Sequence, residues 1–481
     1  MAQPQQQTAT YGRHMAQPER STTLGALRAS GHEHRPIRAE IRENLLDQMR
    51  SGQTRFPGIV GFDTTVLPAL ERALLAGHDL VLLGERGQGK TRLIRALVSL
   101  LDEWTPVVDG CEINDHPYVP VCTRCQRLHA EVGDDLAVGW WHRSERYSEK
   151  LATPDTSVGD LIGDIDPVKV AQGRTLGDPE TLHFGLVPRT NRGIFAINEL
   201  PDLAERIQVS LLNVLEERDI QVRGYVLRLP LDLLLIASAN PEDYTNRGRI
   251  ITPLKDRFGA EVRTHYPLAL DDEITLVRQE ATLVATVPDF LIEVIARFTR
   301  HVRESPAVDS RSGVSARFGI AAAETAAASA LRRSALTGET PAVARICDLL
   351  PSVDTLLGKV EFEVDEEGRE AEVLSHLLRR ATVESFRHHL GASDLRPLIE
   401  RFDEGLVVES GDLVPGQRLL EQVGPIAGLA HMMELLGVDE GAETPALAAA
   451  ALEFALEGLF LNRRISKDTS EDGDFVVYGG S

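Results

Sequence analysis

The chain has 481 residues, a formal net charge of −22 and a hydrophobic content of 42%. This length suits two or three domains, and the composition is that of a globular protein. The negative charge argues against a protein that mainly coats nucleic acid or an anionic membrane, so we expect no nucleic-acid partner.

The sequence also predicts where the protein works. No run of about 18 or more apolar residues is present, so we expect no membrane span. The N-terminus lacks the apolar core of a secretion signal, and four cysteines are too few for a disulfide scaffold. We therefore expect a cytoplasmic protein.

Three regions follow one another along the chain. Residues 1–35 are rich in Gln, Thr, Ser, Arg and His, and we expect them to be disordered. Residues 36–267 open with an amphipathic helix at Arg38–Arg50 and then alternate strands and helices, which predicts an α/β domain with a mostly parallel sheet. Its predicted strands are Leu80–Leu83, Gly193–Ile197 and Leu233–Ser238.

The third region, residues 268–481, is predicted to be a helical lid or C-terminal domain, because strand signals fade after Pro267. An acidic insertion at about 358–372 interrupts it and is expected to form a solvated turn or short hairpin. The predicted helices are Asp271–Thr282, Asp289–Val302, Arg317–Ala330, Ala342–Leu350, Ala371–Leu390 and Pro445–Leu461.

A complete phosphate-loop motif lies between the first predicted strand and a helical segment. Its residues are Gly84, Glu85, Arg86, Gly87, Gln88, Gly89, Lys90 and Thr91. In this arrangement backbone N–H groups and a helix N-terminus converge on phosphate. The glycines let the backbone wrap the anion, Lys90 reaches the β- and γ-phosphates, and the Thr91 hydroxyl can bind Mg²⁺. The motif predicts a site for a nucleoside triphosphate.

Two further strands end in polar residues. The strand 193–197 is followed by Asn198 and Glu199, and the strand 233–238 leads to Asn240. Nucleotides bind at the carboxyl edge of a parallel sheet, where these side chains are expected to lie. Glu199 is the candidate base that orients the attacking water, and Asn240 is the candidate sensor of the γ-phosphate. Asn198 stands where an aspartate usually supports Mg²⁺, so it adds no negative charge there.

Two arginines after the last strand are candidates for contacts with the transferring phosphoryl group. Arg257 lies in the segment Leu254–Gly259 and is the candidate arginine finger donated to a neighbouring subunit. Arg317 opens a helix of the second domain and is the candidate that reaches back to the nucleotide.

Together these stretches resemble the AAA+ ATPases, in particular the branch of magnesium-chelatase subunit I and MoxR-like proteins. The resemblance runs from about Phe56 to the end of the helical region. Besides the residues above, it includes Pro57–Gly61 with Val60 and Gly61 near the adenine, Phe184–Gly193 before the Walker B strand, Leu211–Glu217, a hairpin at Ile220–Leu229 around Gly224, and Gly313–Arg317 as the sensor-2 motif.

The resemblance implies a P-loop core followed by a helical lid, and a homo-oligomeric, hexameric ring that binds ATP and Mg²⁺ at subunit interfaces. Lys90, Thr91, Glu199 and Asn240 would act within one subunit, Arg257 would come from the neighbour, and Arg317 would couple nucleotide state to lid angle. It also implies a partner protein with a von Willebrand factor A domain.

A cysteine-rich insertion at about 108–130 is not explained by ATP hydrolysis. Cys111, Cys122 and Cys125 are accompanied by His116 and His129. Three thiolates and one imidazole would make a closed tetrahedral structural zinc site, with His116 as the preferred fourth ligand and His129 as the alternative. A redox pair or unrelated buried cysteines are the competing interpretations.

The main functional hypothesis is an AAA+ ATPase that remodels or activates a partner protein complex, in a MoxR-like chaperone role. The alternatives are the ATPase subunit I of a magnesium or cobalt chelatase, and a scaffold that binds ATP but hydrolyses it slowly. Asn198 is the feature that favours the slow scaffold. A motor that acts on DNA is disfavoured by the net charge of −22.

Overall fold

The computed structural model describes residues 20–171, 181–216, 220–222, 225–227, 229–241, 249–309, 313–425, 428–438, 444–469 and 475–480. The chain divides into two compact units. Unit 1 comprises residues 1–57, 66–83 and 90–263, and unit 2 comprises residues 58–65, 84–89 and 264–481. The glycine loop therefore clusters with the second unit, while the strand before it and the helix after it belong to the first.

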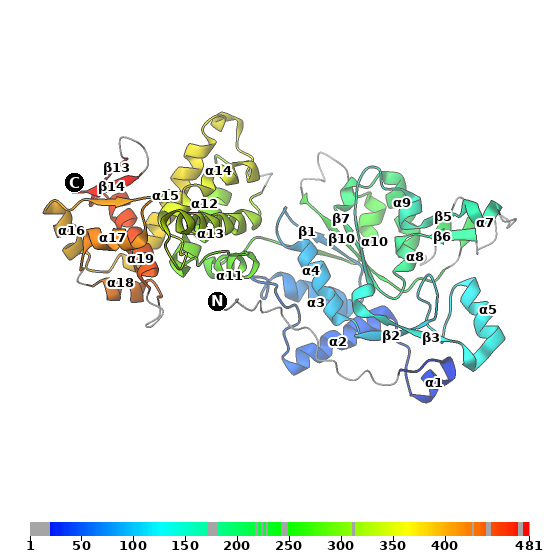
Figure 1. Cartoon of the computed structure of the whole chain (residues 1–481). Coiled ribbons are helices and arrows are strands. Elements are labelled where there is room, and N and C mark those ends of the chain that lie inside the picture. The colour runs from blue at the N-terminus through cyan, green and yellow to red at the C-terminus, as the bar shows by residue number, and fades with distance from the viewer. Residues whose placement is uncertain are drawn as a thin grey trace. The chain divides into compact units, whose positions relative to one another are not determined.

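Unit 1 is built on a five-stranded sheet in the order β11-β1-β10-β7-β4, and every neighbouring pair is parallel. Figure 1 labels its central strands β1, β10 and β7. The helix α3 packs against β11 and α4 against β10. The strands are β1 (Leu80–Leu83), β4 (Tyr147–Leu151), β7 (Ile194–Asn198), β10 (Leu234–Ala239) and β11 (Ala260–Arg263). The parallel sheet confirms the predicted α/β fold class.

The remaining elements of unit 1 cover this sheet or extend from it. Its helices are α1 (Leu24–Ala29), α2 (Ile37–Ser51), α3 (Val66–Ala76), α4 (Lys90–Ala96), α5 (Thr123–Val132), α6 (Val158–Leu161), α7 (Pro167–Ala171), α8 (Leu186–Arg189), α9 (Glu205–Glu216) and α10 (Thr252–Arg257). Three antiparallel pairs are β2 (Trp104–Val108) with β3 (Val138–His142), β5 (Gly163–Ile165) with β6 (Leu182–Phe184), and β8 (Ile220–Val222) with β9 (Tyr225–Leu227). The last pair forms the predicted hairpin, whose Gly224 lies outside the described residues.

The three central strands were predictable because each contains a run of apolar residues. In β1 and β10 every residue is buried. The strands β4 and β11 lie at the two edges of the sheet and are only partly buried, so their sequences mix polar and apolar residues. Edge strands of this kind carry no continuous apolar run, and the sequence analysis did not identify them.

The predicted disorder of residues 1–35 is wrong for the part that the structure describes, from residue 20 onward. Here α1 buries Leu24 and Leu27 completely or nearly so. The backbone N–H of Leu24 donates to Leu136 O (2.9 Å), and the Arg20 guanidinium stacks 3.5 Å above the Trp104 ring. The segment is ordered because it packs on residues more than 80 positions away, which its own polar composition does not show.

Unit 2 contains a helical core and one small sheet. Its helices are α11 (Leu270–Glu280), α12 (Asp289–Glu304), α13 (Arg317–Thr337), α14 (Ser352–Leu356), α15 (Glu370–Leu390), α16 (Arg396–Asp403), α17 (Gly416–Val423), α18 (Leu429–Leu435) and α19 (Pro445–Leu461). The antiparallel sheet has the order β12-β14-β13, from Val408–Ser410, Val476–Gly479 and Ser466–Thr469. The helical character of this region is confirmed, and the sheet is an addition to it.

One predicted helix of unit 2 is wrong. The segment Ala342–Leu350 contains only a short 3₁₀ turn at Ile346–Leu349. Before it the chain is extended, because Thr286 N donates to Ala342 O (3.1 Å) and Ala344 N donates to Thr286 O (2.7 Å). The acidic insertion, predicted as a turn or short hairpin, contains 3₁₀ turns at Leu357–Lys359 and Val364–Glu366 and is followed by the start of α15.

Two buried glutamates tie α19 to the small sheet. Glu453 Oε2 lies 3.0 Å from Arg345 Nε, and its other oxygen accepts from Ser410 Oγ (2.7 Å). Glu457 Oε2 accepts from Tyr478 Oη and from Lys467 Nζ, both at 2.6 Å. A buried carboxylate is costly unless it is paired, and both of these are. Among the described residues, no helix is both long and apolar enough to cross a bilayer.

Glu293 of α12 is the centre of a charged cluster in unit 2. It accepts hydrogen bonds from Arg297 Nε (2.8 Å) and His389 Nε2 (2.9 Å), and it is nearly fully buried. The hydrogen bond with Glu293 raises the pKa of His389 above 6.5. Although burial opposes it, hydrogen bonding to His389 and Arg297 holds the pKa of Glu293 at about 2, below its ordinary 4.5.

We expect this cluster to make unfolding depend on pH. The His389 contribution is fully present below its unfolded pKa of 6.5 and is lost as pH rises through the higher folded value. The Glu293 contribution is present above 4.5 and is lost as pH falls toward about 2. The pair therefore stabilises unit 2 most between pH 4.5 and pH 6.5, which are the unfolded pKa values of Glu293 and His389.

In urea unfolding, His389→Asn is expected to lose on the order of 1 kcal/mol at pH 6 and less at pH 8. The matched control is His431→Asn, because His431 is 67% exposed and its ion pair is with the exposed Glu434. An equal loss at both pH values would contradict the assignment of the proton to His389.

Candidate functional site

The carboxyl ends of the three central strands lie at one edge of the sheet. Leu83 pairs with Ala239, and Ala237 pairs with Ile197, so β1, β10 and β7 end close together. The residues that follow β10 and β7 are Asn240 and Glu199, and Lys90 begins α4 after the glycine loop. The parallel topology thus gathers three of the predicted residues at one sheet edge of unit 1.

Hydrogen bonds connect these side chains. Lys90 Nζ donates to Asn240 Oδ1 at 2.8 Å, and Asn240 is only 7% exposed. Ser238 Oγ donates to Asn198 Oδ1 (3.2 Å) and accepts from Glu199 N (3.3 Å). Ser238 was not predicted from the sequence, because it lies inside an apolar strand, yet it positions both polar residues at the end of β7.

The backbone of Glu199 is unusual. Its φ of +56° and ψ of +48° place it in the left-handed region, which non-glycine residues rarely adopt. Such a conformation costs of order 1 kcal/mol or more, and it clusters at functional sites. The conformation turns the chain sharply after β7, so Glu199 lies at the edge where the strand ends.

The glycine loop is held within unit 2. Gly87 and Gly89 have φ values of +74° and +73°, so both positions need glycine. Gln88 Oε1 accepts from Glu85 N (3.0 Å) and from Thr264 Oγ1 (2.9 Å). The carbonyl of Arg86 accepts from Tyr266 Oη (2.8 Å). These bonds hold the loop against Thr264 and Tyr266.

The segment of unit 2 that holds Arg317 packs on this loop. A Cβ at Gly87 would collide with Ser315, so the two backbones approach as closely as glycine allows. Arg317 begins α13 two residues later and is exposed. The structure thus brings the sensor-2 segment to the glycine loop.

The adenine-proximal segment with Val60 and Gly61 packs on α11. Gly61 has φ +76°, and a Cβ there would lie 3.0 Å from Asp272 Oδ2. The carbonyl of Gly58 accepts from Gln279 Nε2 (2.9 Å). This segment is therefore positioned by unit 2, as the glycine loop is.

Arg257 is the last residue of α10. Its Nη2 lies 2.6 Å from Glu216 Oε1, and the two side chains are 43% and 42% exposed. Within one chain the guanidinium is thus held by a solvent-exposed ion pair, which is worth little and is easily exchanged. Thr91, the predicted Mg²⁺ ligand, follows Lys90 in the first turn of α4.

The residues at the sheet edge of unit 1 fit Mg²⁺ and a phosphate group. Lys90 is directed to the strand end, and hydroxyl and amide oxygens are available from Thr91 and Asn198. Hard oxygen donors of this kind suit Mg²⁺.

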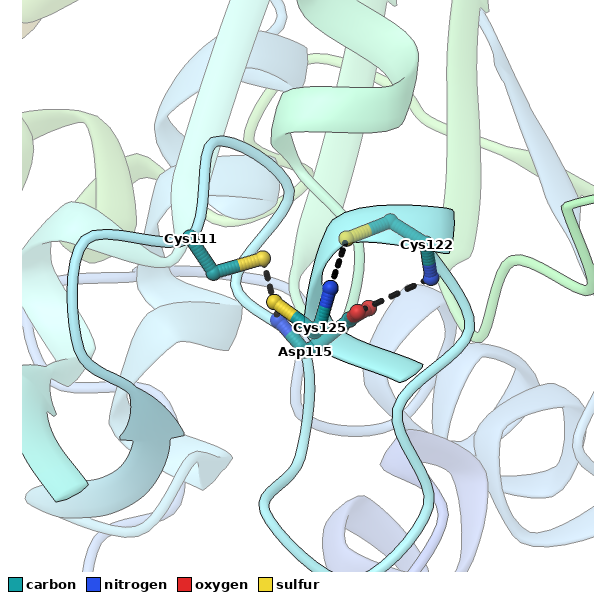
Figure 2. Close-up of side chains that lie close together, drawn as sticks. All are labelled: Cys111, Asp115, Cys122 and Cys125. Carbon is teal, nitrogen blue, oxygen red and sulfur yellow. Dashed lines mark hydrogen bonds between the residues drawn. The ribbon is translucent and has the colours of Figure 1, made fainter. Parts of the chain in front are cut away.

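A second group of side chains converges in the insertion between β2 and β3. Figure 2 shows the cysteine cluster, which consists of Cys111, Asp115, Cys122 and Cys125. One donor atom from each residue lies within 4.8 Å of the donors of the other three. All three thiols are free.

His116 and His129, the two predicted candidates for a fourth ligand, are not among the donors that converge in this cluster. His116 Nδ1 accepts from Tyr118 N (3.0 Å), and its ring packs at 4.2 Å from that of His34. His129 lies in the last turn of α5, away from the helix start that carries Cys122 and Cys125. Asp115 takes the fourth position, because the chain between Cys111 and Cys122 turns its carboxylate, and not the next side chain, toward the sulfur atoms.

The charges in the cluster depend on one another. Hydrogen bonds with Cys122 and Cys125 hold the pKa of the Cys111 thiol far below its ordinary value. Burial raises the pKa of Asp115 to about 6, and the hydrogen bond with Cys111 raises the pKa of Cys122. These four groups compete for few protons in a small volume, which is the situation that a divalent cation relieves.

Comparison with known proteins found no matching family model. The magnesium-chelatase 38 kDa subunit of Rhodobacter capsulatus is 29% identical over 251 residues, covering 50% of this chain and 63% of that protein. The subunit of the same name from Acidiphilium rubrum is 32% identical over 206 residues, covering 41% of this chain and 54% of that protein. This chain thus spans little more than half the length of these relatives.

Among solved structures, a reconstruction of the complex between subunits BchI and BchD of magnesium chelatase is 22% identical and covers 66% of this chain and 98% of that one, with a TM-score of 0.34. That score is too low to add to the fold described above. The sequence matches confirm the predicted resemblance to AAA+ ATPases of the magnesium-chelatase subunit I branch.

Proposed function

Because the chain resembles subunit I of magnesium chelatase over half its length, we propose that it binds and hydrolyses ATP in an oligomeric ring and uses the energy to remodel a partner protein complex. The observation that carries this proposal is the hydrogen bond between Lys90 Nζ and Asn240 Oδ1 (2.8 Å), at the carboxyl edge of the parallel sheet and directly after a complete glycine loop.

The side chains divide the chemistry among them. Lys90 compensates charge on the phosphates, and Glu199 accepts a proton from, or orients, the attacking water. Asn240 accepts a hydrogen bond from Lys90. It follows β10, which is the neighbour of β7, the strand that leads to Glu199. Mg²⁺, when held by Thr91 and Asn198, would neutralise charge that develops on the transferring phosphoryl group.

In the proposed ring, the guanidinium of Arg257 from a neighbouring subunit supplies the remaining positive charge. Arg257 is exposed and weakly paired within its own chain, which suits a residue that leaves Glu216 for the phosphates bound by a neighbour. Ser315 packs on Gly87 of the glycine loop. Arg317, two residues later, would couple the nucleotide state to the helices of unit 2. A hexamer, and a partner with a von Willebrand factor A domain, complete the proposal by analogy with the branch.

The second candidate function is that of an ATPase subunit of a magnesium or cobalt chelatase. Both relatives described above are magnesium-chelatase 38 kDa subunits, which favours this function. A Glu199→Gln variant that holds ATP can be used to trap the partner complex. A trapped complex that inserts a metal ion supports the chelatase role, and a trapped complex without that activity supports general remodelling.

The third candidate, a slow scaffold, depends on Asn198, which adds no negative charge beside the phosphates. Steady-state phosphate release separates it from the ATPase. Turnover far below about 1 s⁻¹ at saturating ATP and Mg²⁺ would favour the scaffold, since ordinary enzymes turn over at about 1 s⁻¹ or faster.

We expect Lys90→Ala to weaken ATP binding on the order of 100-fold, because a phosphate-directed charge and its bond to Asn240 are both lost. Isothermal titration with a non-hydrolysable ATP analogue measures this. Lys359→Ala is the control, since Lys359 is an exposed lysine of unit 2. Equal affinity in the wild type and Lys90→Ala would refute the phosphate-loop assignment.

A further inference from the structure

The cysteine cluster lies in the connection between the antiparallel strands β2 and β3, which also contains α5 (Figure 1). Cys122 and Cys125 belong to the hydrophobic core of unit 1. Cys111 follows a turn at Gly110, whose φ is +64°. Cys122 caps the N-terminus of α5, and Cys125 lies in the first turn of that helix. Two local turns thus bring three sulfur atoms together.

The spacing of the donors suits a tetrahedral ion. Ligands about 2.0–2.3 Å from zinc are separated from one another by roughly 3.3–3.8 Å, and the four donors here lie within 4.8 Å of one another. Backbone N–H groups already point at two of the sulfurs. Asp115 N donates to Cys111 Sγ and Cys125 N donates to Cys122 Sγ, both at 3.3 Å. Such bonds stabilise thiolates and orient them toward a metal.

Asp115 provides an independent sign of a missing ligand. Its side chain is fully buried. One oxygen, Oδ2, accepts from Val121 N (3.1 Å) and Cys122 N (2.9 Å). The other, Oδ1, is buried and accepts no hydrogen bond from any described residue. A buried carboxylate oxygen without a partner is costly, and one oxygen of this carboxylate lies within 4.8 Å of the three sulfur atoms.

We propose that Cys111, Asp115, Cys122 and Cys125 bind one structural Zn²⁺ ion. Three thiolates and one carboxylate oxygen close the tetrahedron and leave no position open for substrate. The ion supplies a partner for the buried Asp115 carboxylate. A disulfide between two of the cysteines would leave the third thiol and the buried carboxylate unexplained.

Binding of the ion also affects the nucleotide site, through the loop that carries the cluster. The loop inside the cluster is bonded to the segment that enters β7. Ile113 O accepts from Asn191 Nδ2 (3.1 Å), Asn114 O accepts from Arg192 Nη1 (3.3 Å), and Asn114 Nδ2 donates to Arg189 O (2.7 Å). Since Glu199 directly follows β7, zinc holds the loop that fixes the start of the Walker B strand.

The test is metal analysis of the intact chain, and it does not depend on ATP turnover. We expect one zinc per chain, and after exchange for Co²⁺ the visible and near-ultraviolet spectrum of a tetrahedral, thiolate-bound ion. Cys125→Ser is expected to lose the metal, and Asp115→Asn to bind it on the order of 10- to 100-fold more weakly. His116→Gln and His129→Gln serve as controls that keep it.

Three results would overturn the proposal. The first is wild-type protein that folds without metal and whose cysteines all react with an alkylating reagent as unprotected thiols. The second is a Cys122–Cys125 disulfide found by mass analysis under non-reducing conditions. The third is a His116→Gln variant that loses zinc while Asp115→Asn keeps it. If Cys125→Ser fails to fold, the comparison of Asp115→Asn with His116→Gln still decides the ligand set.

Discussion

Replacing Glu199 by glutamine is expected to lower kcat for ATP hydrolysis by about 1,000-fold while ATP remains bound. The substitution keeps the size of the side chain and its hydrogen-bonding capacity but removes the group that takes the proton. Both residues meet the same backbone strain at φ +56°, so we expect no change in unfolding temperature.

The control for this variant is Glu205→Gln, an exposed glutamate in the first turn of α9. Phosphate release and nucleotide binding are measured on the same preparations. If Glu199→Gln lowers binding and turnover by the same factor, the residue supports the fold of the site and does not act on water.

Arg257→Ala is expected to lower kcat by about 10³-fold or more in the assembled ring, with little effect on ATP binding by the isolated chain. The reason is that the guanidinium would act on the nucleotide of a neighbour. Arg263→Ala is the matched control, because Arg263 is 77% exposed and pairs only with Glu261.

Two further variants separate a role in the neighbouring site from a local one. Glu216→Gln breaks the ion pair of Arg257 within its own chain but leaves the arginine in place, so we expect activity to be kept. Mixing Lys90→Ala with Arg257→Ala chains is expected to restore part of the activity, since some interfaces then hold both native residues. A mixture as inactive as its components would contradict the shared site.

Much of the nucleotide site was predictable because its signals are local. The glycine loop is one continuous motif, and each strand that leads to it is a short, fully apolar run. Parallel topology then places the residues after such strands at one edge of the sheet, which is where Lys90 meets Asn240. The role of Ser238, which bonds both Asn198 and Glu199, was not visible because a serine in an apolar strand carries no signal of its own.

The proposed metal ligands, in contrast, were only partly predictable from the sequence. The spacing of Cys122 and Cys125 predicts that their sulfurs converge, because both lie in one helical turn. Which neighbour completes the site depends on how the loop from Cys111 to Cys122 folds, and Asp115 and His116 are adjacent in sequence but point to different surroundings. Only the tertiary structure separates them, because it places a carboxylate oxygen of Asp115 within 4.8 Å of the sulfur atoms and packs His116 against His34.

The sequence by itself determined the α/β class, the three central strands, most of the helices of unit 2 and the glycine loop with its flanking polar residues, because each of these follows from spacing along a few turns or strands. Only the tertiary structure showed that residues 20–35 are ordered. It also decided the edge strands β4 and β11, the pairing of Glu453 with Arg345, and the choice of Asp115 over His116. In each of these the deciding partner lies far along the chain or depends on the direction of a single side chain, and burial and hydrogen bonding with that partner set the outcome.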